Sequence, residues 1–402
     1  MLRVSEIRNH KEAFTEGLAK RNFKQPELID EILSLDNRRK DNQTEHDECL
    51  SEINTKSKAI GALFQSGDHQ AANAAKGTVT ELKEKAKRLE DVKKEIMNSL
   101  EEALLTVPNI PHPTVQQGTS DADNEVIQTW EGELPDLSDE ALPHWDIASK
   151  YRLMDFEAGV KIAGSGFVLY RGKGAKLERA LINFFLDEAS AAGYEEILPP
   201  HLVNAESAKA TGQLPDKEGQ MYYCEKDDLY LIPTAEIPVT NIYRDTILKK
   251  DELPVKLAGY TPCFRREAGS YGSEVKGLNR VHQFNKVEIV QITEPEKSYA
   301  TLHNMVEYVE GLLKKLELPY RILRLCGGDL GFTSALTYDF EVYSAAQKKW
   351  LEVSSVSNFE TFQSNRLKVR YKDENGKNQL AHTLNGSALA LARIVACLLE
   401  NH

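Results

Sequence analysis

The segment TPCFRREAGSYGSEVKGLNRVHQFNKVE, residues 261–288, is the most informative part of the chain. Its two ends have the length and apolar content of strands, and a glycine-rich stretch with Lys276 and Arg280 lies between them. Arg265 and Glu267 stand where the first strand would end. The segment therefore predicts two strands of a sheet with a charged loop between them.

On both sides of this segment, apolar runs of strand length alternate with windows that fit a helix, such as GAKLERALINFFLDEASAAGY. Several runs alternate strictly between apolar and polar residues, as strands with one buried face do. Short loops join consecutive runs, which favours antiparallel pairing, because parallel strands need crossover helices. We therefore predict an α+β domain built on an antiparallel sheet over residues 108–402. The strand-length runs are FVLY, YEEILPPHLV, DLYLIPTAEIP, VKLAGYTPCFRRE, HQFNKVEIVQI, LTYDFEVYSA and KWLEVSSVS.

Residues 1–107 are predicted to form a separate N-terminal domain with a long helical hairpin. From residue 26 to residue 105 the chain is rich in Glu, Lys, Ala, Leu and Gln, which are good helix formers. Apolar residues recur in alternating steps of four and three, as in a coiled coil. Three glycines within residues 61–77 predict the tip of the hairpin there. The coiled-coil positions are Leu28, Ile32, Leu35, Cys49, Ile53, Ile60 and Leu63 in the first helix and Leu82, Ala86, Leu89, Ile96, Leu100 and Ala103 in the second.

The hairpin alone fits two interpretations, a dimerising coiled coil and an arm that binds nucleic acid. Basic residues crowd the second helix and dot the first, although Glu and Asp are interleaved with them. These basic residues fit two interpretations: a solvent-exposed helix face of mixed charge, and a face that contacts the phosphates of a nucleic acid. The basic residues are Arg38, Arg39, Lys40, Lys56 and Lys58, and then Lys83, Lys85, Lys87, Arg88, Lys93 and Lys94.

Composition narrows the class of protein. The net charge of −12 argues against indiscriminate binding of nucleic acid by the whole surface, although it allows a local basic face. No apolar run approaches the roughly 20 residues that span a bilayer, and the N-terminus lacks the apolar stretch of a secretory signal. We expect a cytoplasmic protein without a membrane partner. The five cysteines show no CxxC spacing, so no zinc site is expected.

Five motifs in order resemble a known family. The chain contains neither of the two commonest nucleotide-binding loops, GxxxxGK[ST] and GxGxxG. FRREAGS followed by GLNRVHQFNKVE, near residues 261–288, resembles motif 2 of the class II aminoacyl-tRNA synthetases in its seryl form. GYEEILPPHLV, near residues 193–203, resembles motif 1, and HTLNGSALALARIVACLLEN, near residues 382–402, resembles motif 3. IPTAEIP and LEVSSVSNFETFQSNR resemble the seryl Thr-Ala-Glu loop and the ATP–metal strand. With the hairpin, the resemblance to bacterial seryl-tRNA synthetases covers nearly the whole chain.

The resemblance implies an α+β, antiparallel-sheet class II catalytic domain with an N-terminal antiparallel coiled-coil arm. It implies a homodimer that activates L-serine with ATP and Mg²⁺ and transfers the seryl group to tRNA(Ser), and to tRNA(Sec) where that is present. Two alternatives are a paralogue that activates an amino acid for a carrier protein and an inactive RNA-binding paralogue. Relatives of the first kind lack the arm, and the second would have lost residues such as Arg265 or Glu352.

The same resemblance assigns roles to individual residues. Arg265 fits the α-phosphate of ATP, because a guanidinium offers a planar bidentate fork. Glu267 would accept a hydrogen bond from the adenine amino group, and Phe284 and Arg393 would enclose the ring. Phe284 as an ordinary core residue is the competing interpretation. The catalytic residues are Arg265, Glu267 and Arg393; the ATP-binding residues are Arg265, Glu267, Val281, Phe284, Glu352, Val353, Ser354, Ser355 and Arg393.

Two further sets are carried over from the family. Glu352 and Ser355 would hold Mg²⁺ together with the ATP phosphates, since this hard cation prefers oxygen ligands. Glu288 would accept from the ammonium or the hydroxyl of serine, and Ser387 would complete the hydroxyl site. The L-serine-binding residues are Thr234, Ala235, Glu236, Arg265, Glu288, Asn385 and Ser387.

Overall fold

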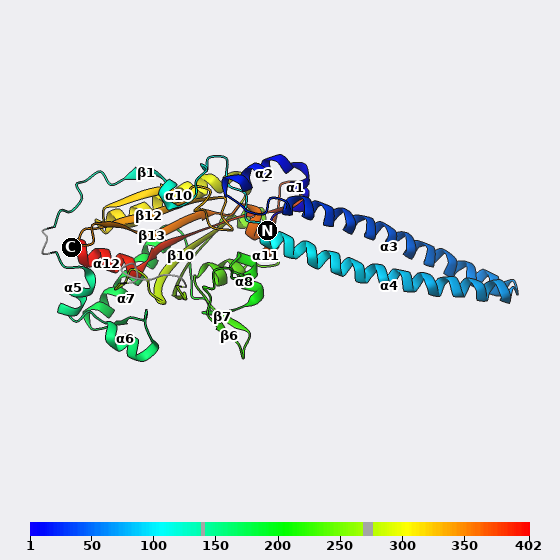
Figure 1. The fold of residues 1–402 in the computed structure, drawn as a ribbon, viewed down its shortest axis with the longest axis horizontal. Helices are drawn as coiled ribbons and strands as arrows, with labels where there is room; N and C mark the ends of the chain where they lie inside the picture. The colour runs from blue at the N-terminus through cyan, green and yellow to red at the C-terminus, as the bar shows by residue number, and fades with distance from the viewer. Residues whose placement is uncertain (138–140, 268–275) are drawn as a thin grey trace. The chain divides into compact units, whose positions relative to one another are not determined.

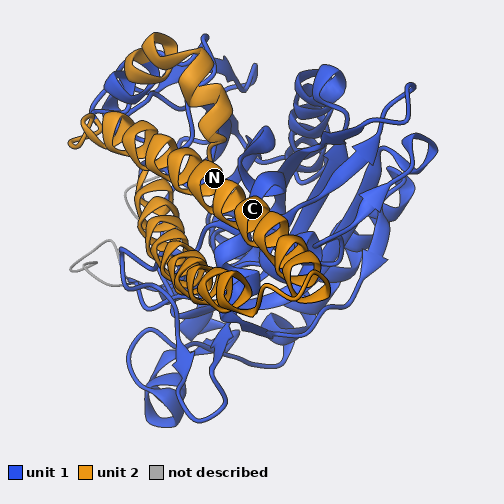
Figure 2. Ribbon diagram, turned by 90° about the vertical axis from the view of Figure 1, so that its right-hand side faces the viewer, with its two compact units in different colours: residues 1, 17–22, 109–402 blue, residues 2–16, 23–108 orange. Residues whose placement is uncertain are grey.

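The computed structural model describes residues 1–137, 141–267 and 276–402. Within these ranges the chain divides into two compact units, which Figure 2 colours separately. Residues 2–16 and 23–108 form what we call the arm unit, and residues 1, 17–22 and 109–402 form the sheet unit. None of the helices in the described ranges is both long and apolar enough to cross a membrane.

The arm unit is dominated by two 38-residue helices, α3 (Leu28–Gln65) and α4 (His69–Thr106), which run side by side in opposite directions (Figure 1). Two short helices, α1 (Val4–Asn9) and α2 (Lys11–Lys20), precede them. Across the pair, Cys49 Sγ donates to the carbonyl oxygen of Leu82 at 3.2 Å, and Lys85 Nζ lies 2.7 Å from Glu45 Oε1. The predicted hairpin is confirmed, and these two contacts fix its register.

The tip of the hairpin is much shorter than residues 61–77, which the glycines had predicted. Only residues 66–68 leave the helices, and Gly67 adopts a φ of 80° there. The Asp68 side chain caps α4 by accepting a hydrogen bond from the backbone N–H of Ala71 at 3.0 Å. Gly61 and Gly77 lie inside the helices, because a solvent-facing helix position tolerates glycine at a cost of about 1 kcal/mol.

A buried charge cluster links α1 to the early turns of α3. Asp36 is buried, and its carboxylate pairs with Arg8, Arg39 and Lys40 at 2.8, 2.8 and 3.1 Å. Burial opposes ionisation of this carboxylate, but the hydrogen bonds to the three basic side chains outweigh burial and lower the pKa of Asp36 to about 2. The first turns of the arm are therefore held by charge as well as by apolar contact.

The sheet unit is built on an eight-stranded sheet in which seven strands pair antiparallel with their neighbours (Figure 1). The edge strand β4 pairs parallel with β9. The antiparallel sheet predicted from the short loops is confirmed. In spatial order the strands are β1 (Glu125–Thr129), β11 (Tyr320–Arg324), β12 (Leu336–Ser344), β13 (Lys349–Asn358), β16 (His382–Ala390), β10 (Gln283–Thr293), β9 (Val255–Phe264) and β4 (Glu195–Ile197).

Three long helices, α7, α10 and α12, share one apolar core with this sheet. Strands β9 and β10 contribute alternate residues to that core and turn the other residues to the opposite face. On the opposite face, part of these strands packs in a second apolar cluster with residues of α8, α9 and α11, and the rest carries polar side chains. The helices of the sheet unit are α5 (His144–Lys150), α6 (Phe156–Ala163), α7 (Lys173–Ala191), α8 (Ala205–Thr211), α9 (Glu236–Asn241), α10 (Ser298–Lys315), α11 (Thr361–Leu367) and α12 (Leu391–Asn401).

Two predicted strands are wrong in detail. YEEILPPHLV forms two short strands in different sheets, β4 and β5 (Leu202–Asn204), because two prolines interrupt the run. DLYLIPTAEIP is a strand only over β7 (Leu229–Leu231), and its second half begins α9. The smaller sheets pair β2 (Met154–Asp155) with β3 (Leu169–Tyr170), β7 with β5 and β6 (Tyr223–Cys224), and β14 (Arg370–Lys372) with β8 (Ile247–Leu248) and β15 (Asn378–Leu380).

Candidate active site

Strand β10 carries polar side chains to the face of the sheet opposite the core that it shares with α7, α10 and α12, on the side of α9. Lys286 and Glu288 lie on this face, whereas Val287 and Ile289 point into the apolar core, and the partly buried Phe284 packs against that core as well as under Arg265. Lys286 and Glu288 are only 5% and 2% exposed, respectively. A buried charged pair of this kind is costly unless it is fully paired, so its partners define the site.

Thr234, Lys286 and Glu288 form a group in which each side chain contacts the other two. Lys286 Nζ lies 2.5 Å from Glu288 Oε2 and donates a hydrogen bond to Thr234 Oγ1 at 2.9 Å. The Thr234 hydroxyl in turn donates to Glu288 Oε2 at 3.4 Å. The structure thus brings together two of the predicted serine-binding residues, Thr234 and Glu288, and adds Lys286 to them.

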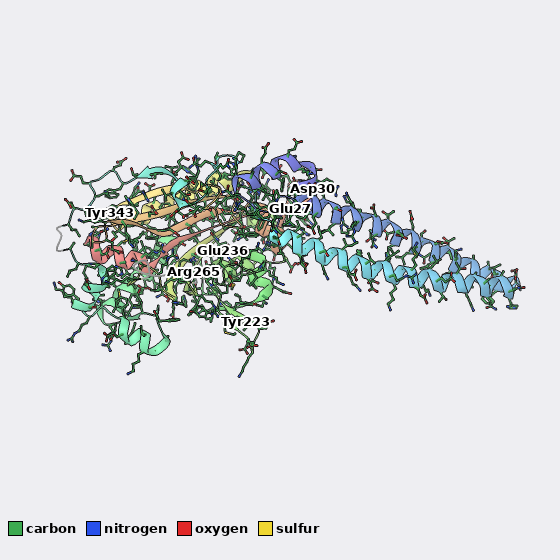
Figure 3. All side chains as sticks on the ribbon, in the orientation of Figure 1. Glu27, Asp30, Tyr223, Glu236, Arg265 and Tyr343 are labelled. Carbon is green, nitrogen blue, oxygen red and sulfur yellow. The ribbon has the colours of Figure 1, made fainter. Side chains whose placement is uncertain are left out.

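Glu236, labelled in Figure 3, lies at the start of α9 and is a second buried carboxylate near Glu288. Gln363 Nε2 donates to Glu236 Oε1 at 2.6 Å, and Gln213 Nε2 donates to Glu236 Oε2 at 3.3 Å. The side chain of Asn385 is also hydrogen-bonded to it. Burial, and then the nearby Glu288 carboxylate, raise the pKa of Glu236 to about 7. A cation that entered this site would favour the ionised form of Glu236.

Strand β16 supplies the neighbouring residues of the predicted serine site. Ser387 lies directly opposite Glu288 in the antiparallel pair of β10 and β16. Asn385 lies two residues earlier on the same strand, and both side chains are buried. Because residues two apart share one face of a strand, Asn385 and Ser387 face the same side as Glu288.

Arg265 begins the part of the site predicted to bind ATP. Its guanidinium lies over the Phe284 ring at 5.3 Å, and its Nε donates to the carbonyl oxygen of Pro233 at 3.4 Å. Glu267 accepts a hydrogen bond from Arg280 Nη1 at 3.2 Å instead of pairing with Arg265. The fork of Arg265 is thus not engaged by the nearest acidic side chain. Residues 268–275 of the predicted motif 2 loop lie outside the described residues.

Arg393 and Glu352 lie together at the other side of the predicted ATP site. Arg393 Nη1 donates to the backbone oxygen of Glu352 at 2.6 Å, and Arg393 Nε donates to the backbone oxygen of Asn279 at 2.9 Å. The Glu352 carboxylate is half exposed and lies 3.9 Å from Arg393 Nη1. Arg393 is therefore anchored through two backbone carbonyls, one next to motif 2 and one on β13.

The residues expected to hold Mg²⁺ supply suitable oxygen atoms. Ser355 Oγ lies 3.3 Å from Glu352 Oε1, and the buried Asp339 lies opposite Ser355 in the pair of β12 and β13. Oδ1 of Asp339 has no hydrogen-bond partner among the described residues. Burial, and then the nearby Glu352 carboxylate, raise the pKa of Asp339 well above its usual range. A carboxylate, a hydroxyl and ATP phosphates would suit this cation.

Four of the predicted residues have side chains that face away from any ligand. Ala235, Val281 and Val353 belong to apolar clusters, and the Ser354 hydroxyl donates to the backbone oxygen of Ser387 at 2.6 Å. These residues can contact a ligand only through their backbone atoms. The remaining predicted residues carry polar or aromatic groups on the site side.

The residues of the site that were not predicted include Lys286, Asp339, Gln213 and Gln363. Lys286 could have been found from the pattern HQFNKVE, because it alternates with Phe284 and Glu288. Asp339 and Gln363 could not, since their places depend on the register of β12 with β13 and on the packing of α11.

Family models match both parts of the chain. The seryl-tRNA synthetase N-terminal domain matches residues 1–111, and the tRNA synthetase class II core domain (G, H, P, S and T) matches residues 222–402. A serine–tRNA ligase from Salinibacter ruber is 50% identical over 403 residues, covering 100% of this chain and 94% of the relative. The chain belongs to the seryl-tRNA synthetase family. The resemblance carried by the five motifs is thereby confirmed.

Solved structures of seryl-tRNA synthetases share this fold. The enzyme from Pyrococcus horikoshii, complexed with ATP, matches with a TM-score of 0.93 and 32% identity over 100% of this chain and 94% of that chain. The cytoplasmic serine–tRNA ligase from Naegleria fowleri, in complex with AMP, matches with a TM-score of 0.87 and 26% identity over the same shares. The predicted class II fold with a helical arm is confirmed.

Proposed function

We propose that this chain is a serine–tRNA ligase, which activates L-serine with ATP and transfers the seryl group to tRNA(Ser). The observation that carries the proposal is the convergence of Thr234, Glu236, Glu288 and Ser387 beside Arg265 on one face of the sheet. Curated relatives that match 100% of this chain at 45–50% identity are named serine–tRNA ligases, which supports the same activity.

ATP binds across the end of β9 and the start of β10. The Arg265 fork contacts the α-phosphate, where negative charge grows as the serine carboxylate attacks. Phe284 stacks on the adenine ring from one side, and Arg393 covers the other side with its cation. Glu267 accepts from the adenine amino group through the carboxylate oxygen that Arg280 does not use.

Mg²⁺ accompanies ATP at Glu352 and Ser355. When bound, it supplies positive charge to the phosphate oxygens. Asp339 can orient the hydroxyl of Ser355, since the two residues lie directly opposite each other in the pair of β12 and β13.

Serine binds with its ammonium between Thr234 and Glu236 and its hydroxyl between Glu288 and Ser387. A site built to bind a hydroxyl discriminates against substrates that lack one, because its buried polar atoms then stay unpaired. No side chain acts as a nucleophile in either step. The serine carboxylate attacks ATP, and the terminal ribose hydroxyl of the tRNA then attacks the seryl-adenylate, so catalysis depends on positioning and electrostatics.

The arm unit binds the tRNA. Lys83, Lys87 and Arg88 are exposed on α4 and form no ion pair with any described residue, whereas Lys85 and Lys94 pair with acidic neighbours. Unpaired cations on an otherwise acidic protein suit a local contact with phosphates. Where a tRNA(Sec) is present, the same arm serves it.

The active protein is a cytoplasmic homodimer. Leu198 and Leu202, in the segment that resembles motif 1, are 80% and 42% exposed, and exposed apolar residues on one segment suit burial against a second copy. Sedimentation of the purified protein tests this: we expect twice the mass of one chain, and Leu198→Glu should shift the protein toward the monomer.

Charging of tRNA tests the proposed function. The purified protein, with ATP, Mg²⁺ and radioactive serine, should convert a tRNA(Ser) transcript to acid-precipitable seryl-tRNA and should leave a tRNA for another amino acid uncharged. Formation of seryl-adenylate without charging would instead favour the paralogue that serves a carrier protein. Absence of both reactions would favour the inactive RNA-binding paralogue.

A further inference from the structure

Lys286 is a buried ammonium group in the middle of the serine site, and neither step of the proposed reaction uses it. It is 5% exposed, and lysine is rarely buried to this extent unless its charge is paired. Its Nζ lies 2.5 Å from Glu288 Oε2 and donates to Thr234 Oγ1 at 2.9 Å. Across the sheet it lies opposite Thr261 and Ala390, which carry no charge. The Lys286 charge is therefore directed at the substrate-binding group and at no other part of the sheet.

The charges of the site balance only when Lys286 is counted. Glu236 and Glu288 are both buried, at 8% and 2% exposed; Lys286 pairs with Glu288 and is close enough to Glu236 to lower its pKa electrostatically. Two carboxylates and one ammonium leave a single negative charge when all three are ionised. The serine ammonium supplies a single positive charge, and its carboxylate is directed toward Arg265. Buried charges are tolerated when they are neutralised in this way.

Lys286 also determines which carboxylate oxygen of Glu288 is available. Both Lys286 Nζ and the Thr234 hydroxyl are directed at Oε2. Oε1 is left for the substrate. Glu288 is thus held as an acceptor for one neutral hydroxyl, and a second positive charge at that place would lie near the Lys286 ammonium, where like charges repel.

We propose that Lys286 is a positioning residue that determines specificity, because it neutralises Glu288 and so restricts the site to amino acids with one ammonium group. This inference rests on the proposed serine–tRNA ligase function. The substrate that it excludes is L-2,3-diaminopropionate, which is serine with an amine in place of the hydroxyl. The two molecules have nearly the same shape, so a steric wall cannot separate them, whereas charge can.

The test is pyrophosphate exchange with serine and with L-2,3-diaminopropionate at about pH 6, where both amines of diaminopropionate are mostly protonated. It is run with the wild type, Lys286→Met, Lys286→Arg and the double variant Lys286→Met/Glu288→Gln. In Lys286→Met the ratio of kcat/KM for serine over diaminopropionate should fall about tenfold or more, while the KM for ATP stays the same. Lys286→Arg keeps the charge and should retain most of the discrimination. The double variant removes one charge of each sign, so the ratio should return toward the wild-type value even though serine activity is low.

Several outcomes would overturn the proposal. One is a folded Lys286→Met protein with the wild-type ratio, and another is a double variant that discriminates as poorly as Lys286→Met. If Lys286→Met shows no cooperative melting, the double variant decides, because it removes one buried charge of each sign and keeps the net charge of the site; loss of discrimination in that folded protein contradicts the proposal. A wild type without serine-dependent exchange refutes the proposed function and, with it, the inference.

Discussion

Arg265 is the side chain on which the first chemical step depends most. Its guanidinium lies over Phe284, and within the described residues its hydrogen bond is a long one, from Nε to the carbonyl oxygen of Pro233. Among the described residues, neither Glu267 nor a backbone carbonyl forms a hydrogen bond with the two Nη atoms of Arg265. A preorganised cation at a developing charge contributes more than the same cation in water, because it needs no reorganisation.

Arg265→Ala should lower serine-dependent pyrophosphate exchange about a hundredfold or more, the usual effect of losing one such group. Arg266→Ala is the matched control, since that guanidinium lies over Tyr222 and its Nε donates to the backbone oxygen of Met221. Exchange in the control should stay near the wild-type rate. If Arg265→Ala were folded and as active as the control, the assignment of motif 2 would be wrong.

The polar residues of the site could be predicted from the sequence only where they fall within a segment that resembles a family motif. Thr234, Glu236, Glu288 and Ser387 came from the resemblance, and the structure brings them together. The resemblance assigns no role to Lys286 or Asp339. Lys286 belongs to the site because it shares a strand face with Glu288, and Asp339 because it lies across the strands from Ser355. Such neighbours depend on strand register, which a sequence without its structure does not provide.

Helix α3 depends on a charge cluster that makes the stability of the arm sensitive to acid. Because the pKa of Asp36 is lowered from 3.8 to about 2, its ionised form is the one stabilised by folding. Its contribution, about 1–2 kcal/mol, is fully present above pH 4 and is lost as the pH falls from about 4 to 2. In hydrogen–deuterium exchange, the protection factors of residues 28–40 in the full chain, which are corrected for the intrinsic exchange rate at each pH, should fall over this range, and Asp36→Asn should show reduced protection at pH 6 already. Equal protection in the variant and the wild type at pH 6 would contradict this account.

The helical pair α3–α4 should be required for charging but not for activation. The variant lacks residues 49–65 and 69–82, so that the native turn, residues 66–68, is joined to the remaining parts of the two helices. The cuts lie at the level where Cys49 contacts Leu82, so the remaining helices keep their pairing, such as that of Glu45 with Lys85. Every candidate site residue lies in the sheet unit, and we expect pyrophosphate exchange to stay within about twofold of wild type. Charging of tRNA(Ser) should be lost. Normal charging by the shortened protein would require another role for the arm, such as dimerisation.

Long periodic segments were predictable and short ones were not. The heptad pattern of α3 and α4 extends over many turns, so single glycines at residues 61 and 77 do not end it. YEEILPPHLV and DLYLIPTAEIP are each shorter than a typical helix, and proline and tertiary contacts redirect them within a few residues. Part of the site lies on such a short segment, because Thr234 and Glu236 stand where β7 has ended and α9 begins.

The molecule as a whole carries a net charge of −12, whereas the exposed basic residues Lys83, Lys87 and Arg88 lie close together on one stretch of α4. An acidic surface repels nucleic acid except where cations are exposed, which orients a tRNA before it is bound. The charge distribution therefore supports one tRNA-binding face, and it leaves amino-acid selection to the buried site of the sheet unit.

The most direct test of the proposed function is ATP–pyrophosphate exchange by the intact protein with each of the twenty amino acids in turn. Serine should give the highest kcat/KM. Alanine should be lower by a factor that approaches about 10⁴, because it leaves Glu288 and Ser387 without the hydroxyl that they bind, and threonine should be excluded by its extra methyl group. Exchange that is highest with another amino acid, or absent with serine, would contradict the proposed function.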